Sequence, residues 1–274
     1  MKRSTPVKVI AVTSGKGGAG KTSVAVNLGA ALARRHERVL LLDADLGLAN
    51  IDVLLGLQPR YTLAHVLRGE RALREVIVSA PGGLRVVPAA SGVQRMAELN
   101  RSEHAGLIAA FSEMYDEIDT LIIDTAAGIS DSVTSFCQAA SEVLVVLCDE
   151  PASLADGYGL IKVLNRDHGV TRFQVLANMV DTPCDGFELY QRLLATTDRF
   201  LNVAIEYAGH IPRDPYLPRA NRQRRLLLEA WPQSRAAQAF LQLAERVREW
   251  TRPPSPSGRL EFFVDRLVAS EFPA

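Results

Sequence analysis

Short, continuous apolar runs recur along the chain, and stretches with helical spacing separate them. Runs that do not alternate with polar residues are typical of strands covered on both faces, as in parallel sheets. The repeated strand–helix order favours a doubly wound α/β fold, with a mostly parallel sheet and helices on both faces. The predicted strands are Val7–Val12, Arg38–Leu42, Leu84–Pro88, Thr120–Ile123, Val143–Leu147, Phe173–Ala177 and Tyr207–Ile211.

The segment between the second and fourth predicted strands carries weaker signals. Thr62–Gly69 and Arg71–Val78 have the pattern of short helices around a turn. Apolar side chains at helical spacing after His104 predict a core-facing helix, and His104 itself is interpreted as structural.

The C-terminal part of the chain differs in composition from the rest. Residues 1–252 are expected to form one α/β domain, and the Pro/Ser-rich residues 253–258 a linker. Residues 259–274 are expected to form an amphipathic tail helix, with Leu260 and Phe263 on its apolar face. Such a helix suits weak membrane contact, a partner groove or docking on its own domain, and the pattern leaves these open.

A glycine-rich loop follows the first predicted strand and opens into a helical segment. Its spacing from Gly15 to Gly20, Lys21 and Thr22 matches G-x-x-x-x-G-K-[ST] in full, which predicts a phosphate-binding loop. Glycines allow backbone N–H groups to approach a polyphosphate, and the start of the helix attracts the anion. Lys21 is expected to reach the β- and γ-phosphates, and the Thr22 hydroxyl to hold Mg²⁺. The loop residues predicted to bind ATP are Gly15, Lys16, Gly17, Gly18, Ala19, Gly20, Lys21, Thr22 and Ser23.

Carboxylates stand at the ends of two apolar strands. Asp43 and Asp45 close one strand and Asp124 closes another, which puts all three at the ligand-binding edge of a parallel sheet. Beside a phosphate, carboxylates are costly unless they hold Mg²⁺ or orient water. Asp43 and Asp124 are therefore assigned to the metal shell, and Asp45 to the attacking water. The N–H of Gly128, just beyond Asp124, is expected to sense the γ-phosphate.

Composition and charge exclude several classes of protein. Lys plus Arg equals Asp plus Glu, at 31 each, so no global field attracts nucleic acid or anionic lipid. Cys137, Cys148 and Cys184 form no C-x-x-C pair, which argues against a zinc site or a disulfide framework and favours a reducing cytoplasm. No signal peptide or membrane-spanning run is expected.

A second lysine, Lys16, lies inside the loop, and the string Lys-Gly-Gly-x-Gly-Lys-Thr resembles the deviant Walker A loop of the MinD/ParA ATPases. The resemblance implies an ATP-sandwiched homodimer with ATP and Mg²⁺ as cofactors. In it Lys16 reaches the nucleotide of the partner copy, and Lys16, Lys21 and Asp45 are the catalytic residues. Hydrolysis is expected to be slow and switch-like.

The same resemblance assigns residues around the nucleotide. Glu150 is expected to face the dimer partner, and Asn178 to read the adenine edge. Pro212 and Arg213 are expected to lie over the base, and Asn50 matches a residue of the first switch loop. The string Asn-Lys-x-Asp is missing, which favours ATP over GTP.

More narrowly, strings such as Leu-Leu-Asp-Ala-Asp-Leu-Gly-Leu-Ala-Asn resemble the FleN/FlhG group, which regulates the number of polar flagella. The resemblance implies a FleQ-like enhancer-binding transcription activator as partner, and an FlhF-like GTPase as a further candidate. It places the protein in the cytoplasm, with reversible contact at the inner membrane or cell pole through the tail.

Alternative functions come from other branches of the family. A ParA-type DNA-partitioning or MinD-type division-site ATPase would use the same loop. The basic cluster between Arg213 and Arg225 could touch DNA, but a solvated helix face is the favoured interpretation and direct DNA binding is not expected. A reductase like the nitrogenase iron protein would need cluster-binding cysteines, and Cys137 and Cys148 are wrongly placed for that role. An amide synthetase would need a further substrate domain, and none is predicted.

Overall fold

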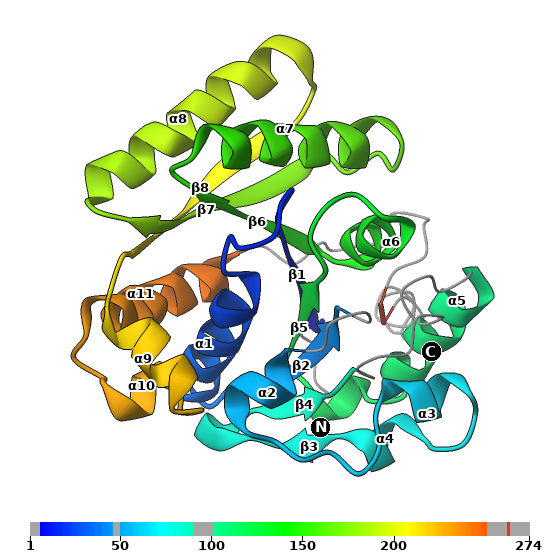
Figure 1. The fold of residues 1–274 in the computed structure, drawn as a ribbon. Coiled ribbons are helices and arrows are strands. Elements are labelled where there is room, and N and C mark those ends of the chain that lie inside the picture. The colour runs from blue at the N-terminus through cyan, green and yellow to red at the C-terminus, as the bar shows by residue number, and fades with distance from the viewer. Residues whose placement is uncertain (1–5, 46–49, 90–100, 251–261, 264–274) are drawn as a thin grey trace.

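The structure is a computed structural model, and it describes residues 6–45, 50–89, 101–250 and 262–263. A single eight-stranded sheet runs through the molecule in the order β3-β4-β2-β5-β1-β6-β7-β8 (Figure 1). The pairing of β3 with β4 is antiparallel, and the other pairings in the described residues are parallel. The strands are β1 (Lys8–Thr13), β2 (Val39–Ala44), β3 (Val78–Ser79), β4 (Arg85–Val87), β5 (Thr120–Thr125), β6 (Glu142–Cys148), β7 (Arg172–Val180) and β8 (Ala204–Pro212).

All seven predicted strands are confirmed, with ends that differ by a few residues. The central strands β1, β2 and β5 are buried along their whole length, as their continuous apolar sequences predicted. The sequence analysis missed β3. Val78 lies in this short edge strand rather than at the end of a helix, because Val78 pairs with Val86 of β4.

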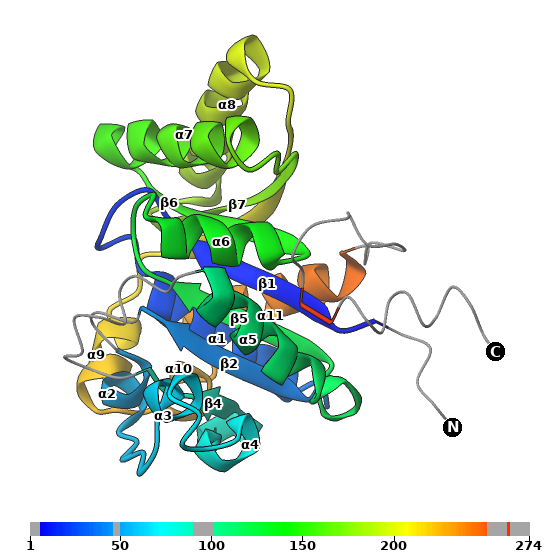
Figure 2. The ribbon, with the colours of Figure 1, turned by 90° about the vertical axis from the view of Figure 1, so that its right-hand side faces the viewer.

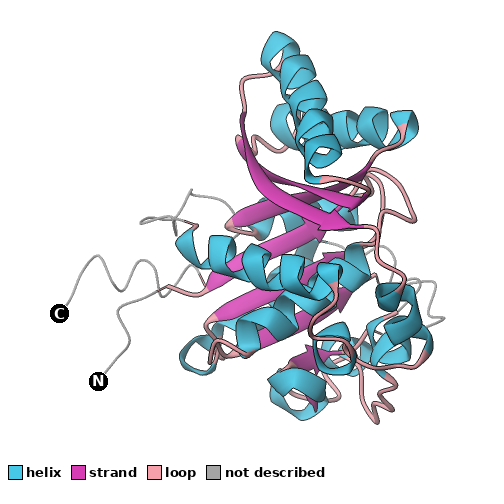
Figure 3. Cartoon of the chain, turned by 90° about the vertical axis from the view of Figure 1, so that its left-hand side faces the viewer, coloured by secondary structure: helices cyan, strands magenta, loops and turns pink. Residues whose placement is uncertain are grey.

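Helices cover both faces of the sheet, as Figure 3 shows. The first face packs against α1 (Lys21–Ala33), α2 (Ile51–Leu55), α9 (Tyr216–Arg222), α10 (Leu227–Ala230) and α11 (Arg235–Glu249). The second face packs against α3 (Leu63–Leu67), α4 (Leu73–Val76), α5 (Arg101–Ser112), α6 (Asp131–Ala139), α7 (Pro151–Arg166) and α8 (Pro183–Phe200). The predicted doubly wound α/β architecture is therefore confirmed.

The order of the strands brings the predicted motifs to one edge. The sheet places β1 between β5 and β6. The chain runs from β1 toward β2 on one side, and β6, β7 and β8 follow on the other, so the strand order reverses at β1, which is where such sheets bind ligands. In register, Asp124 of β5 lies opposite both Val12 of β1 and Asp43 of β2. The loop after β1 lies at the same end of the molecule as α2 and α9 (Figure 2). Chain segments distant in sequence therefore meet where β1 ends.

Two tail residues, Phe262 and Phe263, lie in the core. Both rings are buried, and they contact Phe111 of α5 and the neighbouring Tyr115. The pair forms a turn with a left-handed φ of 64° at Phe263, so the predicted tail helix is corrected at these positions. Their burial favours docking of the tail on its own domain; the rest of the predicted helix and linker lies outside the described residues. Across the described ranges, no helix combines the length and apolarity that crossing a bilayer requires.

Candidate functional site

The loop between β1 and α1 is shaped for a phosphate at two glycines. A Cβ on Gly15 would lie 2.1 Å from the Asp156 carbonyl oxygen of α7, so only glycine fits there. Gly20, the residue before α1, has a φ of 86°, and a Cβ there would lie 2.5 Å from Asn178 Nδ2. Within the described residues no side chain caps the start of α1. Its first N–H groups are therefore available to an anion.

The two lysines of the loop have different surroundings. Lys21 Nζ turns inward and donates to Ser14 Oγ at 3.1 Å, and burial lowers the pKa of its ammonium. Lys16 lies at the rim, with 39% of its side chain exposed, and its Nζ is 2.8 Å from Glu150 Oε2. The Glu150 carboxylate raises the pKa of Lys16, and Lys16 lowers that of Glu150. Lys16 and Glu150 thus pair within one chain at the mouth of the site.

Thr22 and Asp124 form a donor set that suits Mg²⁺. The Thr22 hydroxyl lowers the pKa of the Asp124 carboxylate, whose buried Oδ1 has no hydrogen-bond partner among the described groups. Burial and the neighbouring Asp43 raise the pKa of Asp124 to about 8. In the described part of the chain, no group of three or more His, Cys, Asp or Glu side chains is arranged to hold a metal ion by itself. One carboxylate and one hydroxyl match the way proteins hold Mg²⁺ together with substrate phosphates.

Asp43 organises the loop that follows β2. Its carboxylate accepts hydrogen bonds from the backbone N–H groups of Asp45, Asn50 and Ile51 at 3.1–3.2 Å. Burial nevertheless raises the pKa of Asp43 to about 7. These contacts anchor both ends of the segment that carries Asp45. The charge of Asp45 in turn raises the pKa of Lys21, against the larger effect of burial, so the two predicted catalytic groups interact electrostatically. The metal role of Asp43 and the water-orienting role of Asp45 stay predictions.

Gly128 contacts the phosphate loop directly. Its N–H donates to the Ser14 carbonyl oxygen at 3.0 Å, and its φ of 94° is in the left-handed region that glycine tolerates. The loop after β5 is therefore tied to the residue just before Gly15. This position agrees with the expected γ-phosphate sensor, and that role stays a prediction.

Asn178 lies between the phosphate loop and the predicted base site. Its Nδ2 donates to the Ala19 carbonyl oxygen at 2.7 Å, while its buried Oδ1 has no partner within the described residues. A buried unpaired acceptor is costly unless a ligand satisfies it. The amino group of an adenine would supply the missing donor.

A cavity of about 210 Å³ opens beside Asn178. We call it the base cavity, after the adenine contacts predicted for its walls. Its walls include Ser23, Pro212 and Arg213, so the structure brings these three predicted residues together, and their role in binding a nucleotide stays a prediction. The residues that line the rest of the cavity were not predicted, because α9 carries no nucleotide-binding motif. The missed lining residues are Met179, Asp214, Leu217, Pro218 and Asn221.

The cysteines do not fit a metal cluster. Cys137 is buried in the core on α6, and burial raises the pKa of its thiol to about 12. The three cysteines lie on different elements, α6, β6 and α8, and none belongs to a group of ligating side chains in the described residues. The Sγ of Cys148 is 3.7 Å from the Ala19 carbonyl oxygen, and Cys184 is exposed on α8.

Known proteins match nearly the whole chain. Residues 6–248 match the family described as "ParA: NUBPL iron-transfer P-loop NTPase". The chain is 58% identical over 263 residues to "Antiactivator FleN" of Pseudomonas aeruginosa, covering 96% of this chain and 94% of that protein. It is 31% identical over 238 residues to "Flagellum site-determining protein YlxH" of Helicobacter pylori, covering 86% and 80%.

The fold also matches solved structures of this kind. The septum site-determining protein MinD from Pyrococcus horikoshii, in complex with Mg-ADP, superposes with a TM-score of 0.72 and 26% identity. The match covers 88% of this chain and 96% of that one. The phosphate loop, the Thr22–Asp124 pair and these similarities lead to one conclusion. The chain belongs to the ParA/MinD family of P-loop NTPases.

Proposed function

We propose that this protein is an ATP-dependent switch that regulates the number of flagella: two chains join around ATP, the dimer restrains a transcription activator, and slow hydrolysis separates them. The high identity to an antiactivator and the match to a flagellum site-determining protein support the flagellar role. The same comparisons support a FleQ-like activator as the partner.

The difference between the two loop lysines carries the proposal. Lys21 is turned into its own loop, where it would face a phosphate bound by the same chain. Lys16 lies at the rim, where the one ion pair of its side chain within the described residues is with Glu150, whose side chain is 60% exposed. Exposed pairs of this kind are worth no more than about 1 kcal/mol. Lys16 is thus free to exchange Glu150 for a nucleotide on a second chain.

Segments that follow β2 and β5 also have exposed apolar side chains that a second copy could cover. Val53 of α2 is 59% exposed, and Ile129, which follows Gly128, is 54% exposed. Both belong to segments at the ligand edge of the sheet. Burial of such side chains would favour association of two copies across the bound nucleotide.

The residues of the site divide the chemistry among them. Bound Mg²⁺ would neutralise charge on the β- and γ-phosphates. Thr22 and Asp124 would hold it, with Asp43 fixing the adjoining loop. Lys21 would offset the phosphate charge, and Asp45 would orient the attacking water. The free Oδ1 of Asn178 would select the amino group of adenine.

The remaining assignments complete the proposal. Residues 1–252 form the ATPase domain, 253–258 a linker and 259–274 a tail that exchanges its docked position on the domain, where Phe262 and Phe263 are buried, for weak contact with the inner membrane. An FlhF-like GTPase is a further candidate partner, and the cell pole a candidate location. These parts rest on the family resemblance and on the apolar side chains of the tail.

Light scattering coupled to size exclusion tests the switch. The wild type, Asp45→Ala and Lys16→Ala are compared without nucleotide, with ADP, and with ATP and Mg²⁺. We expect Asp45→Ala to accumulate as an ATP dimer, because binding is retained while hydrolysis is slowed. Lys16→Ala should bind ATP yet remain a monomer. Lys162→Ala is the matched control, since Lys162 is exposed on α7.

Two results would contradict the proposal. One is an Asp45→Ala chain that stays monomeric at saturating ATP and Mg²⁺. The other is a Lys16→Ala chain that dimerises as well as the Lys162→Ala control. Normal hydrolysis by Asp45→Ala would overturn its catalytic assignment alone.

A further inference from the structure

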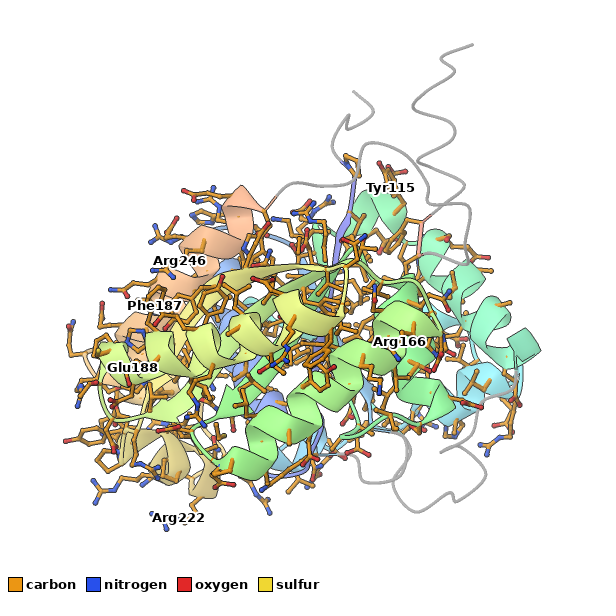
Figure 4. The ribbon with its side chains drawn as sticks, turned by 90° about the horizontal axis from the view of Figure 1, so that it is seen from above. Tyr115, Arg166, Phe187, Glu188, Arg222 and Arg246 are labelled. Carbon is orange, nitrogen blue, oxygen red and sulfur yellow. The ribbon has the colours of Figure 1, made fainter. Side chains whose placement is uncertain are left out.

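The outer side of α9 and the turn after it carry a concentrated positive charge. Tyr216, Arg219 and Arg222 are spaced three apart and share one face of the helix. Arg224 and Arg225 follow in the turn, and all four arginines are exposed. We call Arg219, Arg222, Arg224, Arg225 and Tyr216 the arginine patch. Figure 4 shows Arg222 at the periphery of the molecule, well away from Arg166.

The patch arginines have no carboxylate partners in the described residues, although the chain as a whole is electrically neutral. The nearby Arg213, by contrast, pairs with Asp181. Most arginines elsewhere on the surface also form ion pairs, as Arg38, Arg68 and Arg85 do. A local excess of unpaired guanidinium groups on a neutral protein favours an anionic partner.

An exposed aromatic ring accompanies the charges. Tyr216 is 39% exposed, and its ring stacks on Trp231 with centroids 5.5 Å apart. The Arg219 guanidinium lies 5.9 Å from the centre of the same ring. Arginine and tyrosine are the side chains that most often anchor protein–protein interfaces.

The patch stands on a fixed support. On the inner side of α9, Asn221 Nδ2 donates to Ser23 Oγ at 3.0 Å, next to the base cavity. The aliphatic stem of Arg224 packs against α2 at Gly56, where an added Cβ would lie 3.3 Å from the Arg224 Cβ. A surface held in place before binding loses less entropy when a partner docks.

We propose that the arginine patch docks an acidic, aromatic-containing segment of a partner protein. The carboxylates of the segment would pair with Arg219 and Arg222, and an apolar or aromatic side chain would pack on Tyr216. A protein segment fits better than a nucleic acid because α9 has only seven residues, about 10 Å of helix. Non-specific DNA binding draws on many phosphate contacts and a basic field, and the neutral chain has no such field.

Fluorescence anisotropy of the full chain tests the inference. The probe is a short fluorescein-labelled peptide in which Asp and Glu alternate with Tyr. Its amide twin, with Asn and Gln in place of the acids, measures the part of binding that needs no charge. We expect salt-sensitive binding of the acidic peptide. Arg219→Glu/Arg222→Glu should weaken it by at least about tenfold, and Tyr216→Ala by a smaller factor.

The matched control is Arg166→Glu/Arg199→Glu, which reverses two exposed charges on α7 and α8. It should leave peptide binding unchanged. ATP binding by all variants is measured in parallel, because the inference does not depend on nucleotide-driven dimerisation and stands or falls separately from the proposed function. Equal binding by wild type and Arg219→Glu/Arg222→Glu would overturn it. So would a duplex DNA of equal charge that displaces the peptide and binds more tightly.

Discussion

At the residue scale, the site keeps two carboxylates in surroundings that oppose their charge. Asp43 and Asp124 lie on neighbouring strands in register, and burial raises their pKa values to about 7 and about 8. Three backbone N–H groups partly offset the lost solvation of the Asp43 carboxylate, whereas a single hydroxyl, that of Thr22, favours the charged form of Asp124. The site therefore stores unfavourable electrostatics that a bound cation would relieve.

This arrangement predicts that Asp124→Asn stabilises the nucleotide-free chain. The folded-state pKa of Asp124 lies above the unfolded value of 3.8, so the native state binds the proton more tightly. Stability from this group is fully present below pH 4 and is lost as pH rises to about 8. The neutral amide carries no buried charge, so at pH 8 it should raise the free energy of unfolding by about 1–4 kcal/mol. Urea unfolding at pH 5 and pH 8 measures it.

The increase in the free energy of unfolding of Asp124→Asn over the wild type should be large at pH 8 and clearly smaller at pH 5. Mg²⁺-dependent ATP turnover should fall at the same time, since the amide is a poor ligand for the cation. Equal gains at both pH values would show that the stabilisation does not come from the charge of Asp124.

At the scale of elements, one buried carboxylate joins two helices. Asp214 accepts hydrogen bonds from the N–H groups of Tyr216, at the start of α9, and Ala236, in the first turn of α11, both at 2.9 Å. The same residue lines the base cavity. The position of α9, and with it the cavity wall and the arginine patch, therefore depends on Asp214.

Asp214→Ala should lower the free energy of unfolding by about 2–4 kcal/mol, because two buried N–H groups lose charged acceptors. Thermal or urea unfolding measures this change. ATP affinity should fall as well, since Leu217 and Pro218 move with α9. Asp181→Ala is the control, because the Asp181 side chain is 77% exposed. An Asp214→Ala chain as stable as that control would contradict the assignment.

At the scale of the whole molecule, one apolar cluster lies on one face of the sheet and two lie on the other, and the tail completes one of these two. Phe262 and Phe263 fill the cluster beneath α5, more than 100 residues from the strands they cover. The Phe262 N–H donates to the Ala139 carbonyl oxygen at 3.3 Å, which ties the tail to the end of α6. The tail thus contributes to the stability of the ATPase domain.

Phe263→Ala should lower the free energy of unfolding by about 2–4 kcal/mol. The loss is smaller if the tail detaches before the domain unfolds, and hydrogen exchange in α5 then increases first. Urea unfolding and hydrogen exchange provide the two measurements. Phe200→Ala serves for comparison, because Phe200 is 53% exposed on α8. Equal stability of the two variants would place Phe263 outside the core.

Local patterns in the sequence were enough to predict every strand of the sheet except β3, and to predict the phosphate-binding loop. The glycine spacing before Lys21 and the apolar runs ending at Asp43 and Asp124 are features of neighbouring residues. Strand and helix periods, and the backbone needs of a phosphate loop, can therefore be recognised without any knowledge of long-range contacts. The resemblance in the same motifs identified the family before any fold was known.

Only the tertiary structure decided which distant segments meet. It paired Lys16 with Glu150, brought α9 to the base cavity, and seated Phe262 and Phe263 beneath α5. It also made β3 a strand through pairing with β4. These outcomes depend on how crossovers and helices pack around the finished sheet, because contacts across long loops leave no period in the chain. The sequence by itself therefore determined the chemistry of the phosphate site, and the packing determined what surrounds it.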